Sequence, residues 1–194
     1  SAKTNTWRAA KHIDMRATTI VSQSTPVGNS AISVVRISGP EAFVFSKNLS
    51  HQTSCFEHMK AQYLPVFIKG KEKIDNAIFL PFFSPKSYTG EDVIEISCHA
   101  SFYIQNEIIA LFIRHGCRAA EPGEFTLRAF SNGKIDLSQA EAVADLISSE
   151  NAASHKIAMQ QMRGGFSSEI KKLREELVKF ASLIELELDF SEED

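Results

Sequence analysis

Two charged residues interrupt stretches that otherwise have the pattern of buried β-strands. Arg36 stands within AISVVRIS, and Glu95 stands within DVIEIS. Burying an unpaired charge costs on the order of several kcal/mol, so each residue needs a partner or access to solvent. The pattern leaves two interpretations open: the charges face solvent or pair with one another, or they form a polar ligand site on a sheet.

The ligand-site interpretation has a definite chemistry. A carboxylate can accept two parallel hydrogen bonds from an amino-pyrimidinone edge, such as that of a pterin, while arginine and lysine bind carboxylates or carbonyls at the far end of the ligand. Lys134, in SNGK at the junction of two parts of the sequence, is a candidate third member. The pattern alone does not name the ligand.

Histidine and cysteine do not form a second candidate site. His51, Cys55 and His58 are close in HQTSCFEH, but a structural zinc site requires a further pair of ligands, so a loop after a helix is favoured. Cys98 and His99 are neighbours on a predicted strand and therefore point to opposite faces, which argues against a nucleophile and base pair. We predict no metal ligand and no catalytic residue.

Composition limits the function further. The chain has 194 residues, 43% of them hydrophobic, which is enough for one or two domains. A formal net charge of -3 gives no basic footprint for DNA or for direct RNA binding. Three cysteines without a CxxC pair indicate a reducing compartment, the cytoplasm, and no apolar run suits a membrane span. No GxxxxGK[ST] motif is present, so we expect no nucleotide hydrolysis by this segment.

The elements that must position these charges fall in residues 17–134. The stretches TTIVS, AISVVRIS, QYLPVFIK, KIDNAIFLPFF and DVIEISCH have strand patterns. Ser38 and Glu41 suggest a capping box for a helix that ends before His51, and FYIQNEIIALFIRHG predicts a second helix closed by Gly116. This mixture without regular βαβ units predicts an α+β domain. Residues 1–16 are polar and suggest a leader or an expression remnant.

Residues 135–194 have only helical patterns. Ser138 and Glu141 suggest another capping box, and Gly164 with Gly165 is expected to divide or kink the later helix. An apolar stripe then predicts a long helix for a bundle, with the residues Phe166, Ile170, Leu173, Leu177, Phe180 and Ile184. Two or three helices do not close a bundle easily, so we expect this part to need more chain or another subunit.

Four stretches together resemble one family: TTIVSQSTP with AISVVRISGPEA, SYTGEDVIEISCHA, EPGEFTLRAFSNGKIDLSQAEAVADLISSE and LELDFSEED. They are similar to the N-terminal part of the MnmE (TrmE) family of tRNA-modification GTPases, from about Thr18 to Asp194. The chain departs from the family pattern at PVGNSA and after His99. The resemblance implies an α+β domain similar to the tetrahydrofolate-binding aminomethyltransferase domain, followed by the first helices of a helical domain that ends before an inserted G domain.

The resemblance also implies ligands and partners. The folate-contacting positions of the family fall on Arg36, Glu95 and Lys134, which would hold 5-formyl- or 5,10-methylene-tetrahydrofolate. The N-terminal domain would form a homodimer. The full-length protein, with MnmG (GidA), would use GTP hydrolysis to install a carboxymethylaminomethyl-type group on the wobble uridine of tRNA. GTP, magnesium and potassium would bind only in the G domain, so this segment alone is expected not to be catalytic.

Two alternatives remain at this point. In one, the segment is a dimerisation scaffold whose sheet charges are structural and bind no folate. In the other, it is a stand-alone one-carbon transferase, which would need a general acid or base that the sequence does not offer.

Overall fold

A computed structural model describes residues 18–191 of the protein, except residues 27, 29 and 69–71. The predicted leader therefore lies outside the described residues. The chain divides into two compact units between Lys134 and Ile135. The described part is a mixed α and β protein with one six-stranded sheet and six helices.

The first unit is built on the sheet, whose strand order is β3-β4-β5-β2-β1-β6. Neighbouring strands are antiparallel, except that β1 and β6 are parallel. The strand bounds are Ile20–Gln23 for β1, Ile32–Ser38 for β2, Gln62–Ile68 for β3, Glu72–Phe82 for β4, Val93–His99 for β5 and Arg118–Ala119 for β6. The two-residue β6 was not predicted, because a strand this short has no periodicity to detect.

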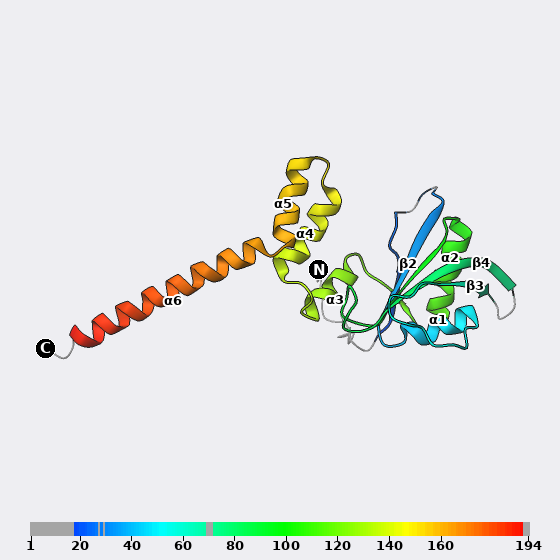
Figure 1. Ribbon diagram of the computed structural model, residues 1–194, viewed down its shortest axis with the longest axis horizontal. Coiled ribbons are helices and arrows are strands. Elements are labelled where there is room, and N and C mark those ends of the chain that lie inside the picture. Colours follow the sequence, from blue (N-terminus) through cyan, green and yellow to red (C-terminus); the bar gives the residue numbers. More distant parts are fainter. Residues whose placement is uncertain (1–17, 27, 29, 69–71, 192–194) are drawn as a thin grey trace, which may run out of the picture. The chain divides into compact units, whose positions relative to one another are not determined.

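Helices α1 (Ala42–Ser50) and α2 (Phe102–Arg114) supply the apolar residues that bury one face of the sheet (Figure 1). Side chains alternate along a strand, so every second residue joins this core. The core includes Val35, Ile37, Ile94, Ile96, Phe79, Leu49, Ile108 and Phe112. A third helix, α3 (Glu124–Ser131), follows β6.

The opposite face of the sheet carries the other set of alternating residues, and part of it is apolar and exposed. Ile32, Tyr63 and Ile78 lie on this face and are 62%, 69% and 45% exposed. Arg36 shares this face, because it alternates with the buried residues Val35 and Ile37 of β2. We call it the open face.

The second unit consists of α4 (Leu137–Ser148), α5 (Ala152–Met162) and α6 (Gly165–Ser191). The helices α4 and α5 pack side by side, and α6 is a single long helix (Figure 1). The predicted division at the two glycines is confirmed: Gly164 has a φ of +76°, between the end of α5 and the start of α6.

Both predicted capping boxes were wrong. Ser38 is the last residue of β2, and the α1 N-cap is Glu41, whose side chain makes no capping hydrogen bond. The chain turns first at Gly39, where a Cβ atom would lie 2.6 Å from the Thr19 Cα, so only glycine fits. In the second unit the box is Asp136 with Gln139, two residues before the predicted pair.

Candidate functional site

The two charges that interrupt the strand patterns are brought together on the open face. Arg36 and Glu95 are directly opposite each other in the antiparallel pairing of β2 with β5. The Arg36 Nε and Nη2 atoms donate hydrogen bonds of 2.9 and 2.7 Å to the same oxygen, Glu95 Oε1. Their side chains are 23% and 27% exposed, so the pair is stabilised mutually while it remains accessible to a ligand.

Two aromatic rings lie beside this ion pair. The guanidinium carbon of Arg36 is 5.2 Å from the centre of the Tyr88 ring and 5.4 Å from that of Phe125. Both distances are within the range of cation–π attraction. The Tyr88 hydroxyl is also 2.8 Å from the Thr126 hydroxyl, which connects the loop before β5 to α3.

Lys134 lies at the same loop but makes a different contact. Its Nζ donates a 2.9 Å hydrogen bond to the carbonyl oxygen of Pro85. Gly90, at a φ of +80°, leaves room for it: a Cβ atom there would be 3.1 Å from the Lys134 Cγ. The structure thus pairs Arg36 with Glu95 and places Lys134 against the loop of residues 84–92, which also carries Tyr88.

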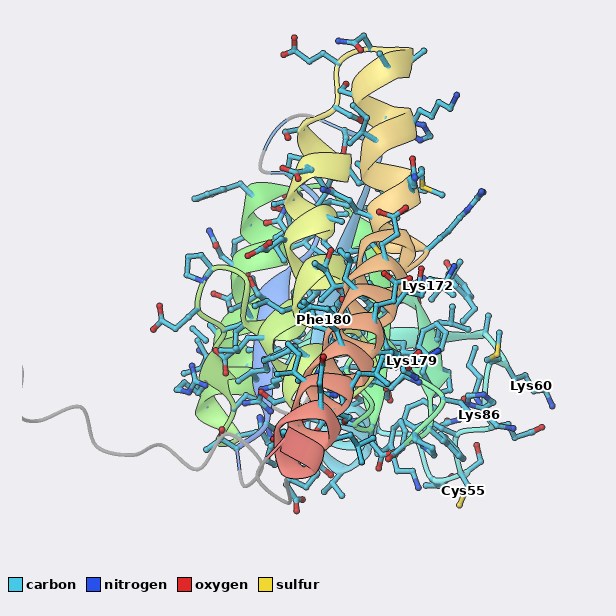
Figure 2. The ribbon with its side chains drawn as sticks, turned by 90° about the vertical axis from the view of Figure 1, so that its left-hand side faces the viewer. Cys55, Lys60, Lys86, Lys172, Lys179 and Phe180 are labelled. Atoms are coloured by element: carbon cyan, nitrogen blue, oxygen red, sulfur yellow. The ribbon has the colours of Figure 1, made fainter. Side chains whose placement is uncertain are left out.

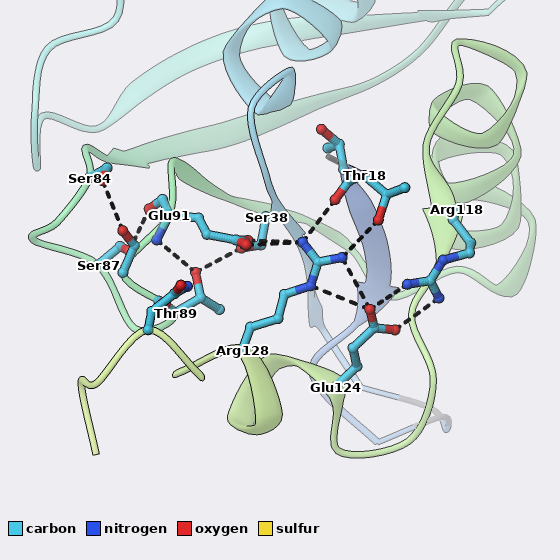
Figure 3. A network of polar contacts seen from close by, with 12 residues as sticks. Thr18, Ser38, Ser84, Ser87, Thr89, Glu91, Arg118, Glu124 and Arg128 are labelled. Atoms are coloured by element: carbon cyan, nitrogen blue, oxygen red, sulfur yellow. Dashed lines mark hydrogen bonds and ion pairs between the residues drawn. The ribbon is translucent and has the colours of Figure 1, made fainter. Parts of the chain in front are cut away.

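A buried polar network holds this loop, α3 and the end of the sheet together (Figure 3). Its centre is Arg128, whose side chain is 1% exposed. Arg128 Nη1 donates to the Thr18 carbonyl oxygen at 2.8 Å and to Glu91 Oε2 at 3.0 Å, and Nη2 donates to Glu124 Oε1 at 3.1 Å. Every nitrogen of the guanidinium has a partner, because Nε also donates to Glu124.

The network extends on both sides of Arg128. Glu124 forms an ion pair with Arg118 of β6. Glu91 accepts a 2.7 Å hydrogen bond from the Ser38 hydroxyl, which also lies 2.7 Å from the Thr89 hydroxyl. The loop of residues 84–92 is therefore anchored to the end of β2 and to α3.

The electrostatics of this network favour the ionised form of Glu124. Burial alone raises the pKa of its carboxyl group, but hydrogen bonds from Arg118, from the Glu121 backbone N–H and from Arg128 outweigh burial. The resulting pKa of Glu124 is about 2, below the ordinary value of 4.5. The carboxylate is consequently charged at neutral pH, as its two arginine partners require.

The open face also carries a hollow of about 220 Å³ near the far end of β5. His99 lies at its edge, with its Nδ1 2.7 Å from Asp75 Oδ1. The adjacent Cys98 is buried, and burial raises the pKa of its thiol to about 11. Cys98 and His99 point to opposite faces, as the strand pattern predicted.

The residues of HQTSCFEH have other roles than metal binding in this structure. The ring of His51 stacks on Phe67, and the backbone N–H of Phe83 donates to His58 Nδ1. Among the described residues, no group of three His, Cys, Asp or Glu side chains could hold a metal ion. Nor is any helix in that part of the chain long and apolar enough to cross a membrane.

Sequence reasoning did not identify Tyr88, Phe125, Glu91 or Arg128. Charged residues of a short helix are usually solvated, so Glu124 and Arg128 gave no signal of burial. The sequence did offer one sign that Glu124 and Arg128 form an ion pair, namely their spacing of four residues. Side chains of opposite charge at positions i and i+4 meet on a helix.

Comparison with known proteins assigns both units. Residues 19–134 match the family model described as the GTP-binding protein TrmE N-terminus, and residues 137–194 match that of the MnmE helical domain. Because the first match alone covers more than half of the chain, the chain belongs to the TrmE/MnmE family. The predicted family is therefore confirmed.

Relatives named tRNA modification GTPase MnmE support this assignment. The relative from Christiangramia forsetii is 59% identical over 180 residues, which cover 91% of this chain and 38% of the relative. The relative from Flavobacterium johnsoniae is 59% identical over 179 residues, 90% of this chain and 38% of the relative. The relative from Cytophaga hutchinsonii is 52% identical over 197 residues, which cover 98% of this chain and 41% of the relative. The chain thus spans about two-fifths of the length of these relatives.

Proposed function

We propose that the sheet unit binds a reduced folate, 5-formyl- or 5,10-methylene-tetrahydrofolate, through Glu95, Arg36 and Lys134. The observation that carries the proposal is the partly exposed Arg36 and Glu95 pair beside the loop that Lys134 contacts. Both hydrogen bonds from Arg36 end on Oε1, so Glu95 Oε2 is available to accept from the amino-pyrimidinone edge of the ligand.

Isothermal titration with 5-formyl-tetrahydrofolate tests this assignment. Removing a charged acceptor costs about 1.5–3 kcal/mol, so Glu95→Ala is expected to weaken binding by about tenfold or more. Glu57→Ala is the matched control, since Glu57 is 63% exposed and pairs with the surface residue Lys60. Unchanged affinity in Glu95→Ala would refute the assignment.

Lys134 is tested separately. Lys134→Met keeps the length of the side chain but removes the charge, and it is expected to weaken binding of the folate's anionic tail. Lys60→Met is the control, because Lys60 is equally a surface cation of the sheet unit. Equal affinities of the two variants would remove Lys134 from the site.

The same unit is also proposed to form a homodimer. The exposed apolar residues of the open face, Ile32, Tyr63 and Ile78, support this role because a contiguous apolar surface favours association. Sedimentation velocity would show a dimer for the 194-residue chain, and Tyr63→Asp would shift it toward monomer. A monomer at all concentrations would contradict the proposal.

A scaffold without folate binding is a second candidate, and one observation favours it. Arg36 and Glu95 already satisfy one another, as structural charges would. A stable dimer that gives no titration heat with any reduced folate would support this second function.

The whole protein to which the chain belongs is proposed to be a GTPase of tRNA modification. Family membership supports this, since the relatives are named tRNA modification GTPases. It would act in the cytoplasm with MnmG (GidA) on the wobble uridine of tRNA, with GTP, magnesium and potassium bound in a G domain. GTP turnover by the full-length protein, and none by the 194-residue chain, is the expected result.

A further inference from the structure

The two shorter helices of the second unit carry charges of opposite sign. The helix α4 contains two acidic residues and no lysine, arginine or histidine. Residues 151–168, which include α5, contain His155, Lys156 and Arg163 but no aspartate or glutamate. The net charge of -3 averages over this separation. The whole chain therefore has no basic footprint, although one of its helices is basic.

The basic residues of α5 lie on the side of the helix that is opposite its packed side. Ala158 is 1% exposed and marks the packed side. Lys156 and Gln160 each lie two residues from Ala158, which is about 200° around a helix, and Arg163 follows Gln160 by three residues. All three side chains are exposed, and together with His155 they border a hollow of about 500 Å³.

The positive charge of α5 is not neutralised by an ion pair within the part of the chain that the structure describes. Every ion pair in that part lies in the sheet unit. The acidic side chains of α4 thus form no ion pair with the cations of α5, although the two helices pack side by side. A charged helix face without such partners in its own unit can attract a partner of opposite sign.

Both ends of α5 are held in place. At its start, the Asn151 side chain accepts hydrogen bonds of 3.0 and 2.9 Å from the backbone N–H groups of Ala153 and Ser154. At its end, Gln139 Nε2 of α4 donates a 2.7 Å hydrogen bond to the carbonyl oxygen of Met162. The exposed side of α5 is therefore positioned before a partner arrives, which lowers the entropy that binding must lose.

We infer that the basic face of α5, which consists of Lys156, Gln160 and Arg163, binds the phosphate backbone of an RNA. Lysine and arginine neutralise phosphates, and a glutamine side chain donates to phosphate or sugar oxygens. All three residues are hydrogen-bond donors and none is apolar, which suits a phosphate backbone better than a protein surface with an apolar centre. The inference rests on the proposed function in tRNA modification and names the surface that holds the tRNA.

Fluorescence anisotropy with a fluorescein-labelled, unmodified tRNA transcript tests the inference on the 194-residue chain at low salt. The double variant Lys156→Gln, Arg163→Gln removes two cations and keeps residues that favour a helix. We expect it to bind the transcript about tenfold more weakly. The slope of the logarithm of affinity against the logarithm of salt concentration is expected to become shallower by about 1.5–2.

The double variant Lys172→Gln, Lys179→Gln is the matched control, because it removes the same charge from the same unit. Each of these lysines lies three residues from a glutamate of α6, Glu169 and Glu176 respectively, so its charge is already compensated on the helix. Its affinity for the transcript is expected to change little. Circular dichroism of both double variants checks that the helices remain folded.

Three results would overturn the inference: equal effects of the two double variants, no binding of the transcript at low salt, or equally tight binding of polyglutamate, which would indicate an acidic protein partner. The proposed function has its own test, the modification of tRNA by the full-length protein. Full-length protein that modifies tRNA equally well with and without Lys156→Gln, Arg163→Gln would refute the inference and leave the proposed function intact.

Discussion

In the sheet unit the apolar side chains are enclosed, whereas along α6 they remain on the surface. Leu49 of α1 is 2% exposed, and Leu177 of α6 is 65% exposed. Phe180 of α6 is 62% exposed, and Lys172 and Lys179 project from the same helix (Figure 2). Since burial of apolar area provides most of the stability of a fold, the first unit contains its own source of stability and α6 does not.

The polar residues show the same difference. The sheet unit buries Arg128 and supplies it with partners on every side, while the cations of α6, such as Arg174, are exposed. A buried and fully bonded charge fixes a unique arrangement of the segments around it, whereas a solvated charge does not. The candidate site lies in the unit that is fixed in this way.

The largest predicted effect comes from breaking the buried network. Arg128→Met leaves Glu91 and Glu124 without their shared cation, so we expect a loss of about 3–5 kcal/mol in the free energy of unfolding. Urea unfolding followed by circular dichroism measures it. Arg174→Met on α6 is the control and should change the free energy by less than about 0.5 kcal/mol. Equal effects of the two variants would contradict the difference between the units.

A pair of identical substitutions compares the apolar residues directly. Leu49→Ala is expected to lower the free energy of unfolding by about 2–5 kcal/mol, because it leaves a cavity in the core. Leu177→Ala removes the same atoms from an exposed position, and we expect about 0.5 kcal/mol or less. Thermal unfolding of both variants gives the comparison. A large loss in Leu177→Ala would show that α6 is covered in solution.

The pH dependence of the network is set by Glu124. A carboxyl group whose pKa is lowered on folding contributes stability above its unfolded pKa and loses it as the pH falls through the folded value. The contribution is thus complete above about pH 4.5 and declines toward pH 2. The stability difference between the original chain and Glu124→Gln should shrink over this range. Glu57→Gln, at a surface site, should show no comparable change.

The smallest predicted effect is local to the second unit. Asp136 caps α4 through a 2.9 Å hydrogen bond from the Gln139 backbone N–H. Asp136→Ala is expected to lower the free energy of unfolding by about 1 kcal/mol. Asp145→Ala, at an exposed position, is expected to change it by about zero. Helical circular dichroism during urea unfolding measures both. A change in folate affinity in Asp136→Ala would show that the site depends on the helical unit.

The strands other than β6 and the long helices could be predicted from the sequence, because alternation and periodicity report burial directly. The pairing of Arg36 with Glu95 was one of the interpretations that the pattern left open. The N-cap residues Glu41 and Asp136 could not be predicted from the sequence, because several nearby residues satisfy the same capping pattern. The pair of Glu91 with Arg128 lies 37 residues apart in sequence and has no local pattern at all. Such pairs become visible only when the fold brings the segments together.

We propose that the sheet unit by itself contains the whole folate-binding site. Isothermal titration of residues 18–134 alone with 5-formyl-tetrahydrofolate, beside the 194-residue chain, tests it most directly. We expect the same dissociation constant for both. Loss of binding by a folded 18–134 unit would contradict it and would place part of the site in the helices.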